Sequence, residues 1–204
     1  FLPHILILTT SSPFWHGRNT GLKSYRSIIF ESLPRTGIPP TFQSYFEYKS
    51  FVETLARAGT IGKRGDGKTD YTKLWWDCRP QEDFGTLEIR VSDVCTTVDE
   101  AICVAALVQA ICAKLIKLRN QNQSWRIYRT ELIAENKWRA VRFGLEGKLV
   151  DYGKAEGVPA RRMLASLEVD PPEARPLGHG ADVRRDRRQR GDRRRLGELR
   201  HVAG

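Results

Sequence analysis

A change in composition near residue 159 divides the sequence into two unequal parts and limits where a folded core can lie. Residues 159–204 contain no Phe, Tyr, Trp, Ile or Lys, but they hold twelve Arg and seven acidic residues. The run from Val183 to Arg195, VRRDRRQRGDRRR, has no apolar periodicity and cannot bury a core. The sequence therefore predicts a folded part over residues 1–158 and an arginine-rich tail over residues 159–204.

Three interpretations of this tail remain open. It is a solvated, disordered segment, a nucleic-acid-binding arm, or the product of a reading-frame change in GC-rich DNA. The net charge of +10 suggests an anionic partner, but half of that excess lies in the tail. A nucleic-acid-binding protein acting through the tail is thus the alternative function, although no aromatic residues stand among the arginines to stack on bases.

Cysteine usage and the longest apolar run both favour a soluble protein in a reducing cytoplasm. The cysteines form no CxxC pair and have no histidine cluster beside them, which argues against a zinc site. We expect them to be small buried hydrophobic residues. The apolar run from Ala101 to Leu118 includes Lys114 and Lys117, so we expect a core helix rather than a membrane span.

The folded part has the pattern of an α+β domain. The apolar segment Phe1–Thr10 is interpreted as a buried strand. Two strand-like runs rich in aromatic and branched residues, Leu74–Cys78 and Thr86–Val91, predict an antiparallel hairpin. Apolar spacing and stop signals predict four helices. The expected helices are Gly21–Leu33, Phe42–Ala58, Val98–Arg119 and Trp125–Phe143.

The second strand of this hairpin contains the most informative pair of charged residues. Alternation along Thr86–Val91 places Glu88 and Arg90 on one face and the apolar side chains on the other. A carboxylate there can bind a hard divalent cation, and a guanidinium can hold a carboxylate or phosphate. A solvent-facing salt bridge across a hairpin would give the same pattern, so the pair alone does not decide between the two.

Two further segments offer candidate residues. Between the first strand and the first helix, SSPFWHGRNTGLKSYR places backbone amides and the cations Arg18 and Arg26 where an anion could bind. His16 in this loop is a weak candidate base, and a capped structural loop explains the segment equally well. In the segment ENKWRA, Asn136, Trp138 and Arg139 could line a site from a helix. An ordinary amphipathic helix without a site would show the same pattern.

The joint order of these segments resembles the carboxylate–amine ligases of the glutamate–cysteine ligase type 2 family. The resemblance covers about Phe1 to Asp151 and corresponds to the C-terminal part of that family. It is carried by SSPFWHGRNTGLKSYR, LPRTGIPPTF, LWWDCRP, FGTLEIRVSDVCTTVDEA, ALVQAI and ENKWRAVRFGLEGKLVD, in this order.

The resemblance implies a fold and a chemistry. The fold would be part of a glutamine-synthetase-like curved antiparallel sheet with helices on its outer face. The reaction would use ATP and Mg²⁺ to phosphorylate a substrate carboxylate, after which an amine displaces phosphate. Glu88 then corresponds to a metal ligand and Arg90 to the catalytic clamp on phosphate or carboxylate. Arg18, Arg26 and Arg139 are expected to bind substrate or ATP.

The resemblance also implies partners. Family members have a further N-terminal portion with other strands and acidic ligands, so we expect this chain alone to be an inactive ligase fragment that depends on that portion. Its substrates would be small amino acids, its location the cytoplasm and its context glutathione biosynthesis. A homodimer is possible, a membrane is not expected, and nucleic acid is the less favoured partner.

Overall fold

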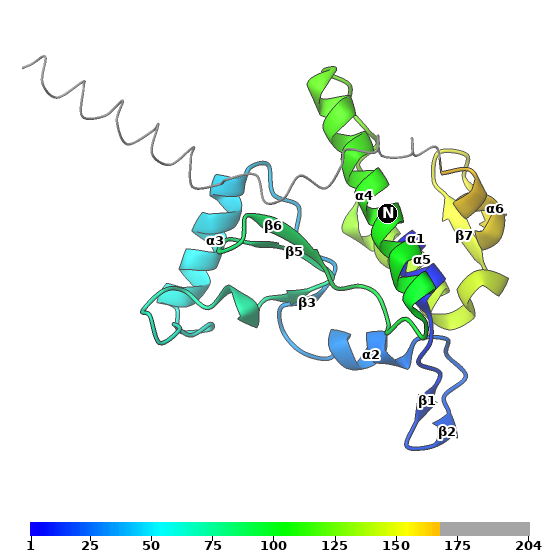
Figure 1. Cartoon of the computed structure of the whole chain (residues 1–204), viewed down its shortest axis with the longest axis horizontal. Helices are drawn as coiled ribbons and strands as arrows, with labels where there is room; N and C mark the ends of the chain where they lie inside the picture. Colours follow the sequence, from blue (N-terminus) through cyan, green and yellow to red (C-terminus); the bar gives the residue numbers. More distant parts are fainter. Residues whose placement is uncertain (168–204) are drawn as a thin grey trace, which may run out of the picture. The chain divides into compact units, whose positions relative to one another are not determined.

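The computed structural model describes residues 1–167 of the chain. Within these residues the fold is α+β, as expected, with helices and short paired strands (Figure 1). The helices are α1 Leu2–Thr9, α2 Tyr25–Glu31, α3 Tyr45–Arg57, α4 Val98–Asn120, α5 Thr130–Phe143 and α6 Ala160–Ala165. The strands are β1 Phe14–Trp15, β2 Arg18–Asn19, β3 Thr36–Gly37, β4 Trp75–Trp76, β5 Cys78–Gln81, β6 Thr86–Ile89, β7 Lys148–Asp151 and β8 Glu156–Pro159.

Helix α1 corrects the expectation of a strand over Phe1–Thr10. A short run that is apolar at every position has no periodicity that separates a buried strand from a buried helix. In the structure, the consecutive residues Ile5, Leu6 and Ile7 are all buried, because α1 lies against α5 and α4. A helix apolar on all sides is stable when it is enclosed by other elements in this way.

The predicted hairpin forms, but with a different first strand. Strand β5 pairs with β6 in antiparallel register, with Arg79 opposite Glu88 and Pro80 opposite Leu87. The aromatic pair Trp75–Trp76 instead forms β4, which pairs in parallel with β3. Among the described residues β5 is an edge strand, where a proline without an N–H can be accommodated.

The curved sheet implied by the resemblance is not seen among residues 1–167. Their strands form four separate two-stranded sheets. Strand β6 has a partner on one edge only in this part of the chain. The glutamine-synthetase-like sheet therefore stays a prediction.

Two hydrophobic clusters stabilise the described unit. The main core joins α1, α4, α5, β7 and α6, and a smaller aromatic core lies between α3 and the segment before β5. The buried residues of the main core are Ile5, Leu6, Ile7, Val91, Ile111, Ala140, Val141, Leu149 and Ala160. Those of the aromatic core are Tyr48, Val52, Ile61, Leu74 and Trp76.

The folded part continues beyond the predicted boundary at Val158. Strand β8 ends at Pro159, and Ala160 in α6 is fully buried in the main core, against which Met163 also packs. The remainder of the predicted tail, including Val183–Arg195, lies outside the described residues, so the three interpretations of it stay open.

Helix α4 forms where expected and begins with a capping box between Thr97 and Glu100. It is not the enclosed core helix that we expected. Only Ala110 and Ile111 are buried, and Cys103 is exposed rather than packed in a core. By length and composition α4 could also cross a membrane, but this test alone is weak evidence, since core helices of soluble proteins pass it too.

Candidate functional site

The β5–β6 hairpin brings the two predicted key residues together. Glu88 and Arg90 lie on the same side of the strand, and Arg90 Nη1 donates to Glu88 Oε1 at 2.8 Å. The backbone N–H of Arg90 donates to the carbonyl of Asp77 at 2.7 Å, which fixes the end of the strand. The alternation deduced from the sequence thus describes this pair correctly.

Glu88 is a strongly hydrogen-bonded carboxylate. Its Oε2 accepts from Arg79 Nε at 2.8 Å and from Gln81 Nε2 at 2.7 Å. Burial by itself would raise the pKa of Glu88, but the hydrogen bonds from Gln81, Arg90 and Arg79 outweigh it and lower the pKa to about 2. Glu88 is therefore ionised at neutral pH, and both of its oxygens already have partners.

Arg79 is a site residue that sequence reasoning missed, because its segment was assigned to a turn. The residue is 4% exposed. Besides Glu88, it donates to the carbonyls of Thr72, at 2.9 Å, and of Leu74. Its position opposite Glu88 in the antiparallel register is the signal that a correct hairpin assignment would have supplied.

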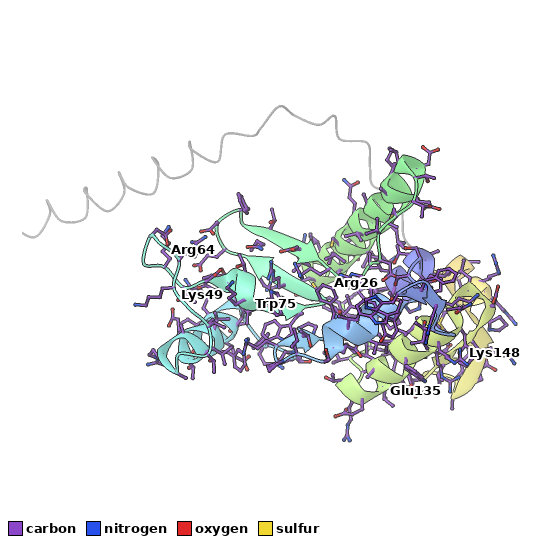
Figure 2. The ribbon with its side chains drawn as sticks, turned by 90° about the horizontal axis from the view of Figure 1, so that it is seen from below. Arg26, Lys49, Arg64, Trp75, Glu135 and Lys148 are labelled. Carbon is purple, nitrogen blue, oxygen red and sulfur yellow. The ribbon has the colours of Figure 1, made fainter. Side chains whose placement is uncertain are left out.

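Arg26 on α2 joins the same cluster. Its Nη2 donates to the carbonyl of Arg90 at 3.0 Å, and its Nη1 lies 4.0 Å from Asp93 Oδ1. The guanidinium also lies over the ring of Phe30, 4.4 Å from the centroid. Burial is the largest influence on Arg26 and lowers its pKa, whereas Asp93 acts in the opposite direction. Arg26 and Trp75, which line the same cavity, are labelled in Figure 2.

Asp93, a second missed residue, explains the loop that we interpreted as a possible anion site. Its carboxylate accepts from the Ser11 amide at 3.0 Å, from Ser12 Oγ at 2.7 Å and from Ser24 Oγ at 2.7 Å. The anion that these loop groups bind is therefore a buried side chain of the chain itself. This contact joins the loop to the end of the hairpin, and so helps to hold Arg26 beside Arg90.

A buried ionic group supports the hairpin from α5. Lys137 Nζ lies 2.5 Å from Asp77 Oδ2 and also contacts Glu31 Oε1. Burial raises the pKa of Asp77, and the nearby Lys137 ammonium only partly offsets that effect. The backbone carbonyl of Asp77 also accepts a hydrogen bond from the Arg90 N–H. The Lys137–Asp77 ion pair therefore connects α5 to the candidate site.

A small cavity lies where these elements meet. Arg26 and Arg90 both line it, and Arg90 Nε is buried without a hydrogen-bond partner among residues 1–167. The remaining lining residues are Ser27, Phe30, Trp75 and Asp77. Two guanidinium groups lie beside this cavity, and guanidinium pairs well with a carboxylate or phosphate. The cavity itself has a volume of about 10 Å³, which is room for about one water molecule, so an anion would bind there only if the cavity widened.

The other predicted residues lie away from this cluster. Arg18 is exposed in β2, and His16 occupies the β1–β2 turn with a positive φ of 48°. Arg139 pairs with Glu135 on the surface of α5 at 2.6 Å. Asn136 exchanges hydrogen bonds with the backbone of Val150 at 2.9 and 2.7 Å, so its amide connects α5 to β7.

Trp138, the last of the predicted residues, is 47% exposed on α5 and is not among the residues that line the small cavity. Residues 1–167 contain no group of three or more His, Cys, Asp or Glu residues that could hold a metal ion. Glu88 could at most provide one ligand.

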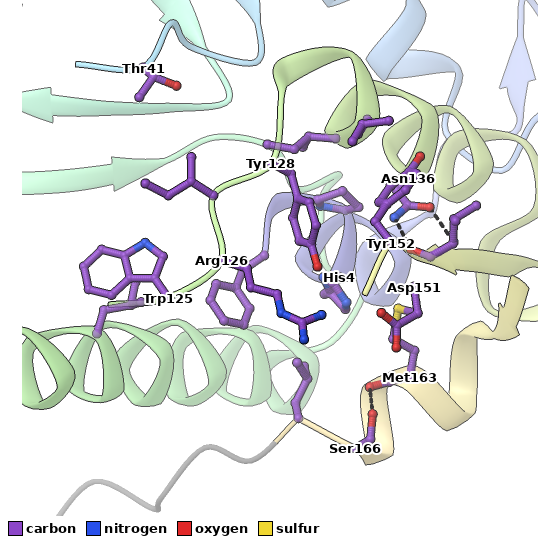
Figure 3. A pocket seen from close by; sticks show the side chains of 18 residues that line it. His4, Thr41, Trp125, Arg126, Tyr128, Asn136, Asp151, Tyr152, Met163 and Ser166 are labelled. Atoms are coloured by element: carbon purple, nitrogen blue, oxygen red, sulfur yellow. Dashed lines mark hydrogen bonds between the residues drawn. The ribbon is translucent and has the colours of Figure 1, made fainter. Parts of the chain in front are cut away.

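A larger cavity of about 520 Å³ lies between α1, the segment after α4, β7 and α6 (Figure 3). Its wall is mainly apolar and aromatic, with Trp125, Tyr128 and Tyr152 among its residues. Burial lowers the pKa of His4 in this wall to about 4, so its imidazole is neutral at pH 7. Within the described part of the chain the two cavities share no lining residue, so the larger one is separate from the Glu88 cluster.

Comparison with known proteins decides the family. The sequence profile described as "Glutamate-cysteine ligase family 2" matches residues 1–200. The chain belongs to this family. The resemblance deduced from the ordered motifs is therefore confirmed.

Two relatives indicate how much of a family member is present. A protein of Rhodospirillum rubrum, provisionally named glutamate–cysteine ligase 2, is 51% identical over 184 residues, which are 90% of this chain and 46% of that relative. A protein of Herpetosiphon aurantiacus with the same provisional name is 54% identical over 167 residues, or 82% of this chain and 42% of that relative. The chain thus spans less than half the length of these relatives.

Proposed function

We propose that this chain contributes part of the active site of an ATP-dependent carboxylate–amine ligase that joins glutamate to cysteine. Family membership supports the ligase class, and the names of the relatives supply the two substrates. The observation that carries the proposal is the cluster of Glu88, Arg90 and Arg26 beside the small cavity. The enzyme would act in the cytoplasm, in glutathione biosynthesis, on small amino-acid substrates.

Arg90 and Arg26 would bind the anionic group that reacts. A substrate carboxylate oxygen attacks the γ-phosphorus of ATP, and ADP leaves. The amine then attacks the acyl carbon, loses a proton and expels phosphate, which leaves an amide. The acyl phosphate formed in the first step and the tetrahedral adduct formed when the amine attacks it both carry anionic oxygens. Preorganised guanidinium groups stabilise such oxygens. Glu88 and Asp93 would keep the two arginines in place.

Magnesium fits these residues only in part. Mg²⁺ prefers about six oxygen ligands, and ATP phosphates and water can supply several of them. Glu88 offers one ionised carboxylate that already accepts three hydrogen bonds. The described residues therefore do not make a magnesium site by themselves, and no step of the proposed reaction is assigned to the metal. Further acidic ligands would come from the remainder of the ligase.

An isotope experiment tests the proposal on a complete protein. We join this chain to the part of the Rhodospirillum rubrum relative that lies outside the match, keeping the two segments in the order that they have in the relative. We call the resulting protein the rebuilt ligase. It is incubated with ATP, cysteine and glutamate labelled with ¹⁸O in its carboxylates. We expect cysteine-dependent amide formation and one ¹⁸O atom in each phosphate released.

Two results would contradict the proposal. Amide formation with unlabelled phosphate would exclude the acyl-phosphate route. No glutamate- and cysteine-dependent ADP release, in a rebuilt ligase that unfolds cooperatively, would exclude the assigned substrates. The unmodified Rhodospirillum rubrum relative serves as the control for each assay.

A further inference from the structure

Helix α4 has two apolar faces, and only one of them is covered by the described chain. Val104, Leu107, Val108 and Leu115 pack against the main core, around the buried Ile111. At 100° per residue these positions form one stripe along the helix. The opposite stripe is mostly apolar as well, with the exposed Gln109 as a polar residue in its middle, so the helix is not amphipathic in the ordinary sense.

The uncovered stripe, which we call the outer face of α4, consists of Ile102, Ala105, Ala106, Gln109, Ala113 and Ile116. Ile102 and Ile116 are 61% and 60% exposed, and the three alanines are exposed as well. This face runs for about 21 Å along the helix at 1.5 Å per residue. The segment from Ala101 to Ala113 contains no Asp, Glu, Lys or Arg.

Such a face is suited to close packing rather than to water. Small side chains let another helix or sheet approach the backbone, and the isoleucines at either end would fill its grooves. A long apolar stripe without charges on a soluble protein marks an interaction surface. Because the inner face is already occupied by the main core, a bilayer could not surround this helix without unpacking that core.

We propose that the outer face of α4 is the docking surface for the other portion of the ligase. The chain spans 46% and 42% of two relatives, so more than half of a family member lies outside the match. Interfaces between domains of one chain commonly bury about 600–1,500 Å². The outer face is a long uncovered and mostly apolar surface within residues 1–167 that could form one. The inference rests on family membership and not on the proposed chemistry.

The experiment compares the chain alone with the rebuilt ligase. Ala106→Glu places a charge in the middle of the outer face, and Ala134→Glu makes the same change at an exposed position on α5. In the chain alone we expect both variants to unfold within about 1 °C of the parent, since both sites face water. In the rebuilt ligase Ala106→Glu should lower the unfolding temperature by about 5 °C or more, because a charge would be buried without a partner.

Thiol labelling of Cys103, with the other three cysteines replaced by serine, provides a second readout that needs no destabilising variant. Cys103 is exposed on α4 in the described chain. We expect its labelling to be about tenfold slower in the rebuilt ligase than in the chain alone. Neither readout depends on catalysis, so an inactive rebuilt ligase would not affect this inference.

Three outcomes would overturn it. Equal thermal shifts for Ala106→Glu and Ala134→Glu in the rebuilt ligase, with Cys103 still reactive, would show that the face stays uncovered. A dimer of the chain alone that Ala106→Glu converts to monomers would assign the face to a second copy. Flotation of the chain with phosphatidylglycerol vesicles, lost in Ala106→Glu, would assign it to a membrane.

Discussion

The main core and the β5–β6 hairpin are stabilised in different ways. In the main core, α1, α5 and β7 meet through buried aliphatic side chains that need only fill space. At the hairpin, directional hydrogen bonds hold Arg79, Glu88 and Arg90 in place. Lys137 on α5 adds a buried ion pair with the neighbouring Asp77. A fold alone does not require buried charges, which are costly unless each has a partner.

The difference separates what the fold needs from what a function needs. Apolar side chains of similar volume can replace one another in a core at small cost. In an ionic cluster that holds guanidinium groups beside a cavity, a residue of similar volume without the charge and the hydrogen bonds is not an adequate replacement. The following predictions test whether the two regions respond to substitution as differently as this account requires.

Lys137→Ala should have the largest effect on stability. The change leaves Asp77 buried with its main cationic partner removed, which we expect to lower the free energy of unfolding by about 4 kcal/mol. Urea unfolding of the chain measures it. The exposed Lys148→Ala serves as the control, and an equal response of the two variants would contradict the assigned role of Lys137.

Leu149→Ala tests the main core. Leu149 is fully buried on β7, and its truncation should cost about 3 kcal/mol through lost burial and a new cavity. Leu149→Met should cost less than about 1.5 kcal/mol, since the core can accept a side chain of similar volume. Equal losses for both variants in the same urea assay would mean that this core also depends on a specific shape.

Glu88→Gln tests the hairpin through its pH dependence. Loss of charged hydrogen bonds should cost about 2 kcal/mol near pH 7. The folded-state pKa of about 2 lies below the ordinary value of 4.5, so this stabilisation is present above about pH 4.5 and is lost as the pH falls towards 2. Unfolding free energies of both proteins between about pH 2 and 7 measure the difference. A difference independent of pH would show that Glu88 is not the ionised partner described here.

Thr97→Ala should have the smallest effect. Thr97 accepts from the Glu100 amide at the start of α4, and loss of this cap should cost about 1 kcal/mol. Thermal unfolding followed by circular dichroism measures it, and Thr97→Ser should restore most of the loss. No change in Thr97→Ala would mean that the start of α4 does not limit stability.

The sequence contained the local features of the site but not its long-range contacts. Alternation along one strand was enough to place Glu88 beside Arg90. The partners Arg79 and Asp93 were missed because their roles depend on strand register and on a loop about 80 residues away. Arg18 and Arg139 lie outside the cluster, Arg18 exposed in β2 and Arg139 paired with Glu135 on α5, so their role in binding substrate or ATP stays a prediction.

The errors in the fold have a related cause. An apolar run such as Leu2–Thr9 indicates burial, but whether it becomes a strand or a helix depends on the neighbours that enclose it. A similar ambiguity affected α4. The sequence indicates an apolar helix, but it does not show how many faces of that helix pack against other elements of the protein. Composition also placed the end of the folded part a few residues early, since α6 contacts the main core through the buried Ala160 and the partly buried Met163 and Leu164 rather than through aromatic residues.

The central claim is that Glu88, on its strand beside Arg90, belongs to the active site of a ligase. The most direct measurement is glutamate- and cysteine-dependent ADP release by the rebuilt ligase carrying Glu88→Gln, with Glu156→Gln as the matched control at an exposed position. We expect turnover to fall about 100-fold or more in Glu88→Gln and to stay within about twofold in the control, with both proteins folded. Turnover by folded Glu88→Gln close to that of the parent would contradict the claim.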